Sequence, residues 1–139
     1  YEIYHKLGIL QNVCKYMKFK YQKKRNIFKA FLYSINGVKA AWRNEIAFRQ
    51  EVVLFISSIP FAVLLGDSLL QIVALLGVLL FVIVVELLNS AIETVINRIS
   101  TDYHILSGRA KDMSSAAVLG ALLIAAFTWV SILIENIFL

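Results

Sequence analysis

The sequence is poor in the residues that interrupt or cross-link a soluble fold. Its 139 residues include one proline and a single cysteine, Cys14, so no disulfide can form within the chain. Charged residues make up 17% and hydrophobic residues 60%, whereas soluble domains average about a quarter charged and about half apolar. A chain this short has too small an interior to bury that much apolar surface in water. The composition therefore favours a membrane protein over a soluble domain.

Several common functional motifs are also absent from the sequence. The six glycines are scattered and form no phosphate loop of the Walker or Rossmann type, and there is no G-x-S-x-G elbow. With one cysteine and two histidines, a zinc site is not expected. The net charge of +5 comes without a basic face interleaved with stacking aromatics, so nucleic acid is not an expected partner.

The basic residues are segregated around long apolar runs. All 14 lysines and arginines lie within residues 6–49 or 98–111. Three crossings of the bilayer place these two segments on the same side, which the positive-inside rule identifies as cytoplasmic. We predict an all-α membrane protein in which uncharged runs of suitable length give transmembrane helices at about 48–65, 69–98 and 115–136.

The N-terminal region combines basic and apolar residues. Ile27, Phe28 and Phe31 open a stripe of apolar residues at helical spacing, which predicts an amphipathic surface helix at about 26–44. Because Met17 directly precedes a basic stretch, we expect residues 1–17 to be an N-terminal extension and residues 18–139 to form a single membrane domain. Residues 100–115 are expected to form a polar connection, and Ser68 to cap the helix that follows it.

One face of the second apolar helix carries a row of polar groups. A step of about 100° per residue places Asn89, Ser90, Glu93 and Asn97 in one wedge with Glu86. A solvated helix end would account for Asn97 alone. Glu86, however, directly follows an unbroken apolar run, and an ionisable group at that depth is costly and usually functional. Glu86 is therefore a candidate general base for a lipid hydroxyl at the membrane boundary.

Charged groups that suit phosphoryl transfer lie at the same boundary. Glu45 precedes the first span, and the topology places it at the cytoplasmic edge with Glu93. Two carboxylates there suit Mg²⁺, which takes few protein oxygens and keeps substrate phosphates as further ligands. Arg109 and Lys111 are candidates for phosphate contact, although each alone is equally explained as a cytoplasmic positive charge. Together these groups predict a lipid kinase that uses Mg²⁺ and ATP.

Three motifs resemble those of the bacterial diacylglycerol kinases. They are Glu86-Leu-Leu-Asn-Ser-Ala-Ile-Glu93, the run from Asp102 to Met113, and the run from Lys39 to Glu51. The similarity extends in register from about residue 28 to residue 134. The resemblance implies a homotrimer of three-span subunits in the bacterial inner membrane, with sites between subunits that phosphorylate diacylglycerol to phosphatidate.

The resemblance also implies roles for individual residues. Glu86 would be the catalytic base, supported by Asn89, and Glu45 and Glu93 would hold the metal and the nucleotide. The remaining ATP contacts would be Tyr33, Asp102, Tyr103, His104, Lys111 and Asp112. The lipid pocket would be bordered by Arg49, Gln50, Glu51 and Ser115.

Two positions depart from the family pattern, and two other functions remain open. Asn97 stands where the family usually has an acidic residue, and Asn26 where it has a basic nucleotide contact, although Arg25 is adjacent. Relatives that phosphorylate undecaprenol share the Glu-Asn-Glu helix, but the run from Ser107 to Met113 is closer to the diacylglycerol branch. The alternative from a different class is a non-enzymatic membrane protein, such as an ion-conducting oligomer or a small assembly subunit, and it would tolerate the loss of the Glu86 carboxylate.

Overall fold

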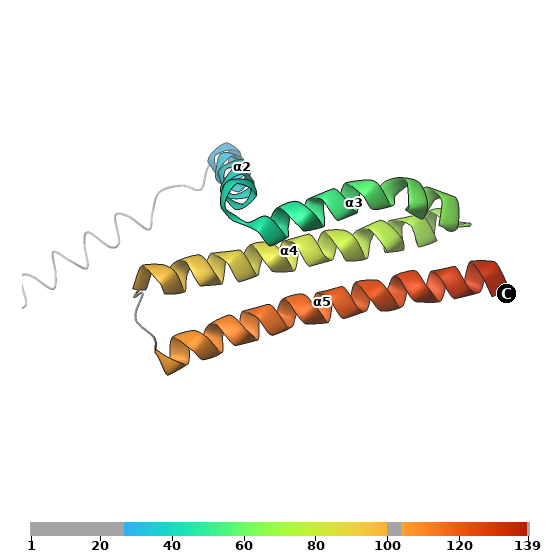
Figure 1. Cartoon of the computed structure of the whole chain (residues 1–139). Helices are drawn as coiled ribbons and strands as arrows, with labels where there is room; N and C mark the ends of the chain where they lie inside the picture. Colours follow the sequence, from blue (N-terminus) through green and yellow to red (C-terminus); the bar gives the residue numbers. More distant parts are fainter. Residues whose placement is uncertain (1–26, 100–103, 139) are drawn as a thin grey trace, which may run out of the picture. The chain divides into compact units, whose positions relative to one another are not determined.

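The computed structural model describes residues 27–99 and 104–138, and it places them in four α-helices (Figure 1). The predicted extension over residues 1–17 and the residues Asn26, Asp102 and Tyr103 lie outside this part of the chain. The chain divides into two units, residues 1–36 and 37–139. The helices are α2 Ile27–Asn44, α3 Ile46–Leu65, α4 Leu69–Ile99 and α5 Ile105–Phe138.

Helices α3, α4 and α5 are each long and apolar enough to cross a membrane. At 1.5 Å per residue, the 20 residues of α3 span about 30 Å, the thickness of a hydrocarbon core. The 31 residues of α4 and the 34 residues of α5 are longer than such a core requires. Large apolar side chains remain exposed on all three helices, among them Leu64, Leu70 and Phe127. The predicted all-α membrane protein with three spans is confirmed, whereas a surface position for α2 stays a prediction.

The start of α5 differs from the sequence-based expectation. Residues 100–115 were expected to be a polar connection, but α5 already begins at Ile105. His104 stabilises this start, because its Nδ1 accepts a hydrogen bond from the Leu106 backbone N–H at 3.2 Å. A side-chain acceptor of this kind satisfies one of the unpaired N–H groups of a helix N-terminus. The polar residues from Ser107 to Ser115 therefore lie in the first turns of α5, which extend the third span, and not in a loop.

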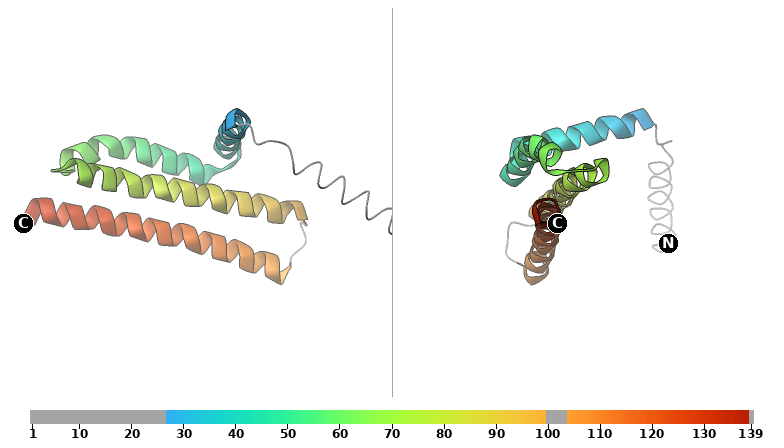
Figure 2. Two further views of the ribbon diagram at one scale, coloured as in Figure 1. Left: turned by 180° about the vertical axis from the view of Figure 1, so that it is seen from behind. Right: turned by 90° about the vertical axis from the view of Figure 1, so that its right-hand side faces the viewer.

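Helix α4 packs against α3 on one side and α5 on the other (Figures 1 and 2). Small side chains at the contacts allow the helices to approach closely, as is usual in membrane bundles. Val82 of α4 meets Ala121 and Ala125 of α5 in one buried cluster. Two further clusters lie nearer the ends of the helices: one contains Ala41, Phe48 and Ile83, and the other contains Ala62, Leu75 and Ile132.

A hydrogen-bonded group of side chains joins the three helices at the α3–α4 turn; we call it the turn cluster, and it comprises Gln71, Glu135 and Asn136. The Asn136 amide Nδ2 donates to the Leu65 carbonyl at the end of α3 and to Gln71 Oε1 of α4. Gln71 Nε2 donates in return to Asn136 Oδ1 at 3.2 Å and to Glu135 Oε2 at 3.3 Å. The predicted N-cap is confirmed, since Ser68 Oγ accepts from the Gln71 backbone N–H. These bonds fix the relative positions of the helix ends opposite the predicted catalytic residues.

Candidate active site

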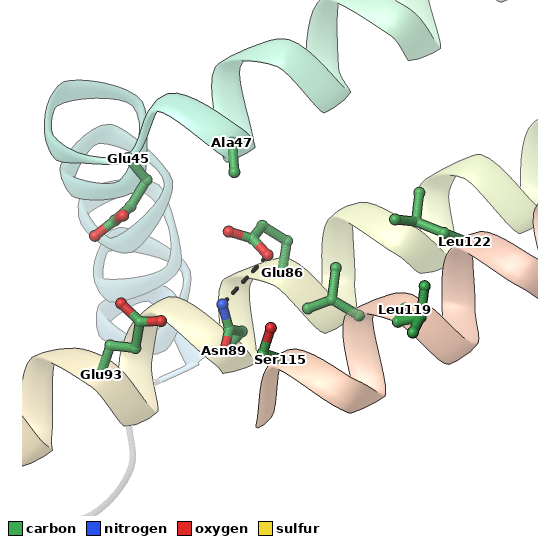
Figure 3. A pocket seen from close by; sticks show the side chains of 9 residues that line it. Glu45, Ala47, Glu86, Asn89, Glu93, Ser115, Leu119 and Leu122 are labelled. Atoms are coloured by element: carbon green, nitrogen blue, oxygen red, sulfur yellow. Dashed lines mark hydrogen bonds between the residues drawn. The ribbon is translucent and has the colours of Figure 1, made fainter. Parts of the chain in front are cut away.

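A pocket of about 390 Å³ lies among α3, α4 and α5. Carboxylates line one part of it and aliphatic side chains the other. Its lining residues are Glu45, Ala47, Glu86, Asn89, Glu93, Ser115, Val118, Leu119 and Leu122 (Figure 3). Glu86 follows the first residue of α4 by 17 positions, about 26 Å along the helix, which is close to the far boundary of a hydrocarbon core of about 30 Å. The pocket is therefore amphiphilic and lies where lipid meets water.

Glu86 is the most buried acid of the pocket, with 5% of its surface exposed. The Asn89 amide, one turn further along α4, donates from Nδ2 to Glu86 Oε2 at 3.4 Å (Figure 3). This bond orients the carboxylate and leaves its second oxygen facing the pocket. The Asn89 Oδ1 atom is buried and has no hydrogen-bond partner. A buried carbonyl oxygen without a partner is uncommon.

Three carboxylates face one another across the pocket. Figure 3 shows the side chains of Glu45, Glu86 and Glu93 directed into the same space, and the charges of Glu45 and Glu93 act on Glu86. Glu45 can turn inward because it is the extended residue before α3, and its side chain makes no capping hydrogen bond. Like charges this close repel one another, so the site is suited to bind a cation.

The donor atoms of the pocket fit Mg²⁺. Within residues 27–99 and 104–138, no group of three His, Cys, Asp or Glu residues surrounds one point, so these residues do not form a closed protein cage. Mg²⁺ does not need one, because it usually takes one or two carboxylates and completes its octahedron with water and phosphate oxygens. Glu45 and Glu93 supply hard carboxylate oxygens to the pocket.

The residues expected to border a lipid are only partly gathered at the pocket. Ser115 lines it, whereas Arg49, Gln50 and Glu51 do not. Glu51 is half-buried, its Oε2 has no hydrogen-bond partner, and its charge interacts with that of Glu86. The Arg49 guanidinium donates from Nη1 to the Trp42 carbonyl at 3.4 Å, and Gln50 is exposed.

Three further residues expected to contact ATP do not line the pocket in this single chain: His104, Lys111 and Asp112. Lys111 donates from Nζ to Asn97 Oδ1 at 2.8 Å and so joins α5 to α4. His104 caps α5, Asp112 is exposed, and Tyr33 is exposed in the first unit of the chain. A nucleotide role for these residues stays a prediction.

Sequence reasoning did not identify the apolar wall of the pocket. Val118, Leu119 and Leu122 follow Ser115 on α5 at intervals of three and four residues, the spacing of one helix face. The sequence contains this spacing, but nearly all side chains of this span are apolar. The pattern of apolar and polar residues therefore does not indicate which face of the helix lines a pocket.

Comparisons with known proteins agree with the sequence motifs. The family profile "Prokaryotic diacylglycerol kinase" matches residues 32–133. A diacylglycerol kinase of Escherichia coli strain K12 is 50% identical over 103 residues, which cover 74% of this chain and 84% of that protein. Diacylglycerol kinases of Haemophilus influenzae and Pseudomonas aeruginosa are 48% and 46% identical, over 73% and 79% of this chain and 86% and 89% of their own lengths.

Proposed function

Because the chain belongs to the prokaryotic diacylglycerol kinase family, a family of bacterial membrane kinases, we propose that it transfers the γ-phosphoryl group of ATP to diacylglycerol. The products are phosphatidate and ADP. The observation that carries the proposal is the pocket at the membrane boundary, where the buried carboxylate of Glu86 lies between an aliphatic wall and two further acids. An amphiphilic alcohol fits such a pocket with its hydroxyl beside Glu86 and its chains along the wall.

Glu86 acts as the general base in this proposal. Its Oε2 is occupied by the Asn89 amide, which leaves Oε1 to accept the proton of the lipid hydroxyl. The hydroxyl oxygen then forms a bond to the γ-phosphorus while the bond from that phosphorus to the bridging oxygen breaks, and ADP departs with the electron pair. General bases placed in this way contribute typically 10²- to 10⁴-fold to a rate. Asn89 is the positioning residue that keeps the carboxylate directed at the hydroxyl.

Glu45 and Glu93 hold the metal and the nucleotide at the polar end of the pocket. Both carboxylates face the same space as Glu86, and each would bind Mg²⁺ through its carboxylate oxygens. The bound ion supplies neutralisation of the phosphate charge during transfer. Lys111, His104, Asp112, Tyr33, Asp102 and Tyr103 are proposed to complete the ATP site, and Arg49, Gln50, Glu51 and Ser115 the lipid site.

The proposed orientation places the site at the cytoplasmic face of the inner membrane. The lysines and arginines lie before Gln50 and between Arg98 and Lys111, and two of them, Arg49 and Arg98, follow the pocket residues Glu45 and Glu93 by four and five positions. We propose a homotrimer with sites completed between subunits, because His104 and Asp112, which the family resemblance assigns to ATP, do not line the pocket of one chain. The α2 helix is proposed to lie in the membrane interface, because its exposed residues include Phe28, Phe31 and Leu32 beside lysines.

The test is the activity of the purified wild type and of Glu86→Gln with radiolabelled ATP and diacylglycerol in mixed micelles. The amide has the size of the carboxylate but cannot accept the proton as a base, so kcat should fall at least 100-fold while trimer assembly and the thermal midpoint are kept. Asp67→Asn, which removes an exposed carboxylate in the α3–α4 turn, is the matched control and should retain full turnover. Retention of turnover by Glu86→Gln would reject the mechanism and favour a non-enzymatic role.

The same assay distinguishes the two lipid acceptors. Undecaprenol offered in place of diacylglycerol should be phosphorylated poorly. A strong preference for undecaprenol would change the assigned lipid acceptor but not the proposed role of Glu86.

A further inference from the structure

The contact between Lys111 and Asn97 has no role in the chemistry described so far. Lys111 lies on α5 and is half-buried, and its ammonium donates to the Asn97 amide oxygen of α4 at 2.8 Å. Among residues 27–99 and 104–138, Asn97 is the side-chain partner of this ammonium, and no carboxylate there pairs with it. The backbone at Lys111 is also held, because the buried Ser114 donates from Oγ to the Lys111 carbonyl at 2.9 Å.

The register of α4 places this contact next to the polar end of the pocket. Asn97 follows Glu93 by four residues on the same helix face, which is a rise of about 6 Å. Lys111 is therefore held one helical turn beyond a carboxylate that lines the pocket. A polyphosphate bound at Glu93 would extend over several ångströms and would come within reach of the ammonium.

A lysine side chain is flexible, and it loses much rotational freedom when it must hold one position. An ammonium has three N–H donors and no acceptor. The Asn97 oxygen occupies one donor, leaves two for phosphate oxygens, and does not cancel the positive charge. The amide thus restricts the lysine before the nucleotide arrives, so less freedom is lost when the nucleotide binds.

We propose that Asn97 is a positioning residue that holds Lys111 for the phosphates of the nucleotide, an inference that rests on the proposed function. Its effect is on the nucleotide rather than on the lipid. Removal of the Asn97 oxygen should therefore raise the KM for ATP and leave the KM for diacylglycerol unchanged.

The test compares the wild type with Asn97→Leu, which has a similar size but no acceptor, and with Asn97→Asp, which keeps an oxygen at that place. Asn97→Leu should raise the KM for ATP about tenfold, the order expected for a lost hydrogen bond to a charged group. Asn97→Asp should stay within about threefold of the wild type. The thermal midpoint of each variant in detergent, with and without Mg-ATP, provides a second readout that does not depend on turnover.

A double-mutant cycle with Lys111→Met identifies the route of the effect. In the Lys111→Met background, Asn97→Leu should change the KM for ATP no further. Three results would overturn the inference: an unchanged KM for ATP in Asn97→Leu, an equal rise in Asn97→Asp, or the full rise retained without the lysine. A wild type that phosphorylates neither lipid would instead reject the proposed function itself.

Discussion

The turn cluster gives a prediction of stability that is independent of the chemistry at the pocket. Asn136→Leu preserves the size of the side chain but removes three hydrogen bonds: two donated by Nδ2, to the Leu65 carbonyl and Gln71 Oε1, and one accepted by Oδ1 from Gln71. Interhelical hydrogen bonds in membrane proteins contribute about 0.6 kcal/mol each on average, and up to about 1.7. The substitution should therefore cost about 2 kcal/mol of unfolding free energy.

The assay is unfolding by sodium dodecyl sulfate in mixed micelles, followed by tryptophan fluorescence. Trp129 is a suitable probe because it packs beside Leu75 in the cluster nearest this turn. A loss of about 2 kcal/mol lowers the folded-to-unfolded ratio about 30-fold. All variants must be compared at one protein concentration, because assembly into oligomers adds to apparent stability.

Asn44→Leu is the matched control, because it makes the same chemical change at an exposed asparagine. Among the residues that the structure describes, the Asn44 side chain bonds within its own helix, from Nδ2 to the Ala40 carbonyl at 2.9 Å, so its effect should stay within about 0.5 kcal/mol. Gln71 lies 15 residues before Glu86 on α4, about 22 Å along the axis. At detergent concentrations below its unfolding midpoint, the Asn136→Leu variant should keep the wild-type kcat. An unchanged midpoint, or a loss no greater than that of Asn44→Leu, would refute the reasoning.

Two further predictions concern the metal site and helix packing. Glu45→Gln and Glu93→Gln should each abolish turnover or raise the Mg²⁺ concentration for half-maximal rate at least tenfold, as measured by Mg²⁺ titration at fixed ATP with Asp67→Asn as control; wild-type metal dependence in both would exclude the proposed ligands. Trp129→Phe keeps an aromatic ring but loses the Nε1 donor to the Leu75 carbonyl at 3.1 Å, so unfolding free energy should fall by about 1 kcal/mol. Because this variant lacks the fluorescent probe, both proteins are followed by circular dichroism in the detergent titration, and a variant as stable as the wild type would contradict the prediction.

Much of the fold and part of the pocket could be predicted because they depend on local patterns. The three spans follow from the length of uncharged runs, and a fixed turn of about 100° per residue places Glu86, Asn89 and Glu93 on one face. The shared depth of Glu45 and Glu93 follows from topology. These inferences need only the geometry of a single helix, the order of the spans and the thickness of a bilayer.

The remaining features depend on contacts between residues far apart in the chain. Gln71 was visible as a polar residue within an apolar run, but its partner Asn136 lies 65 residues away, and no local rule pairs them. The same holds for Asn97 and Lys111, which each have a simple explanation when taken alone as the solvated end of a span. The early start of α5 also depends on a side-chain acceptor, His104, that composition does not reveal.

The unequal lengths of the three spans have a consequence for the approach of the two substrates. Helix α3 begins at Ile46, beside the pocket, whereas α4 continues six residues past Glu93 and α5 begins ten residues before Ser115. At the polar end of the pocket, α4 and α5 thus extend further than α3 does. In the proposed reaction, the nucleotide would approach from water along the extended ends of α4 and α5, and the lipid would approach laterally through the bilayer. Under the proposed function, separate approaches would allow the two substrates to bind in either order.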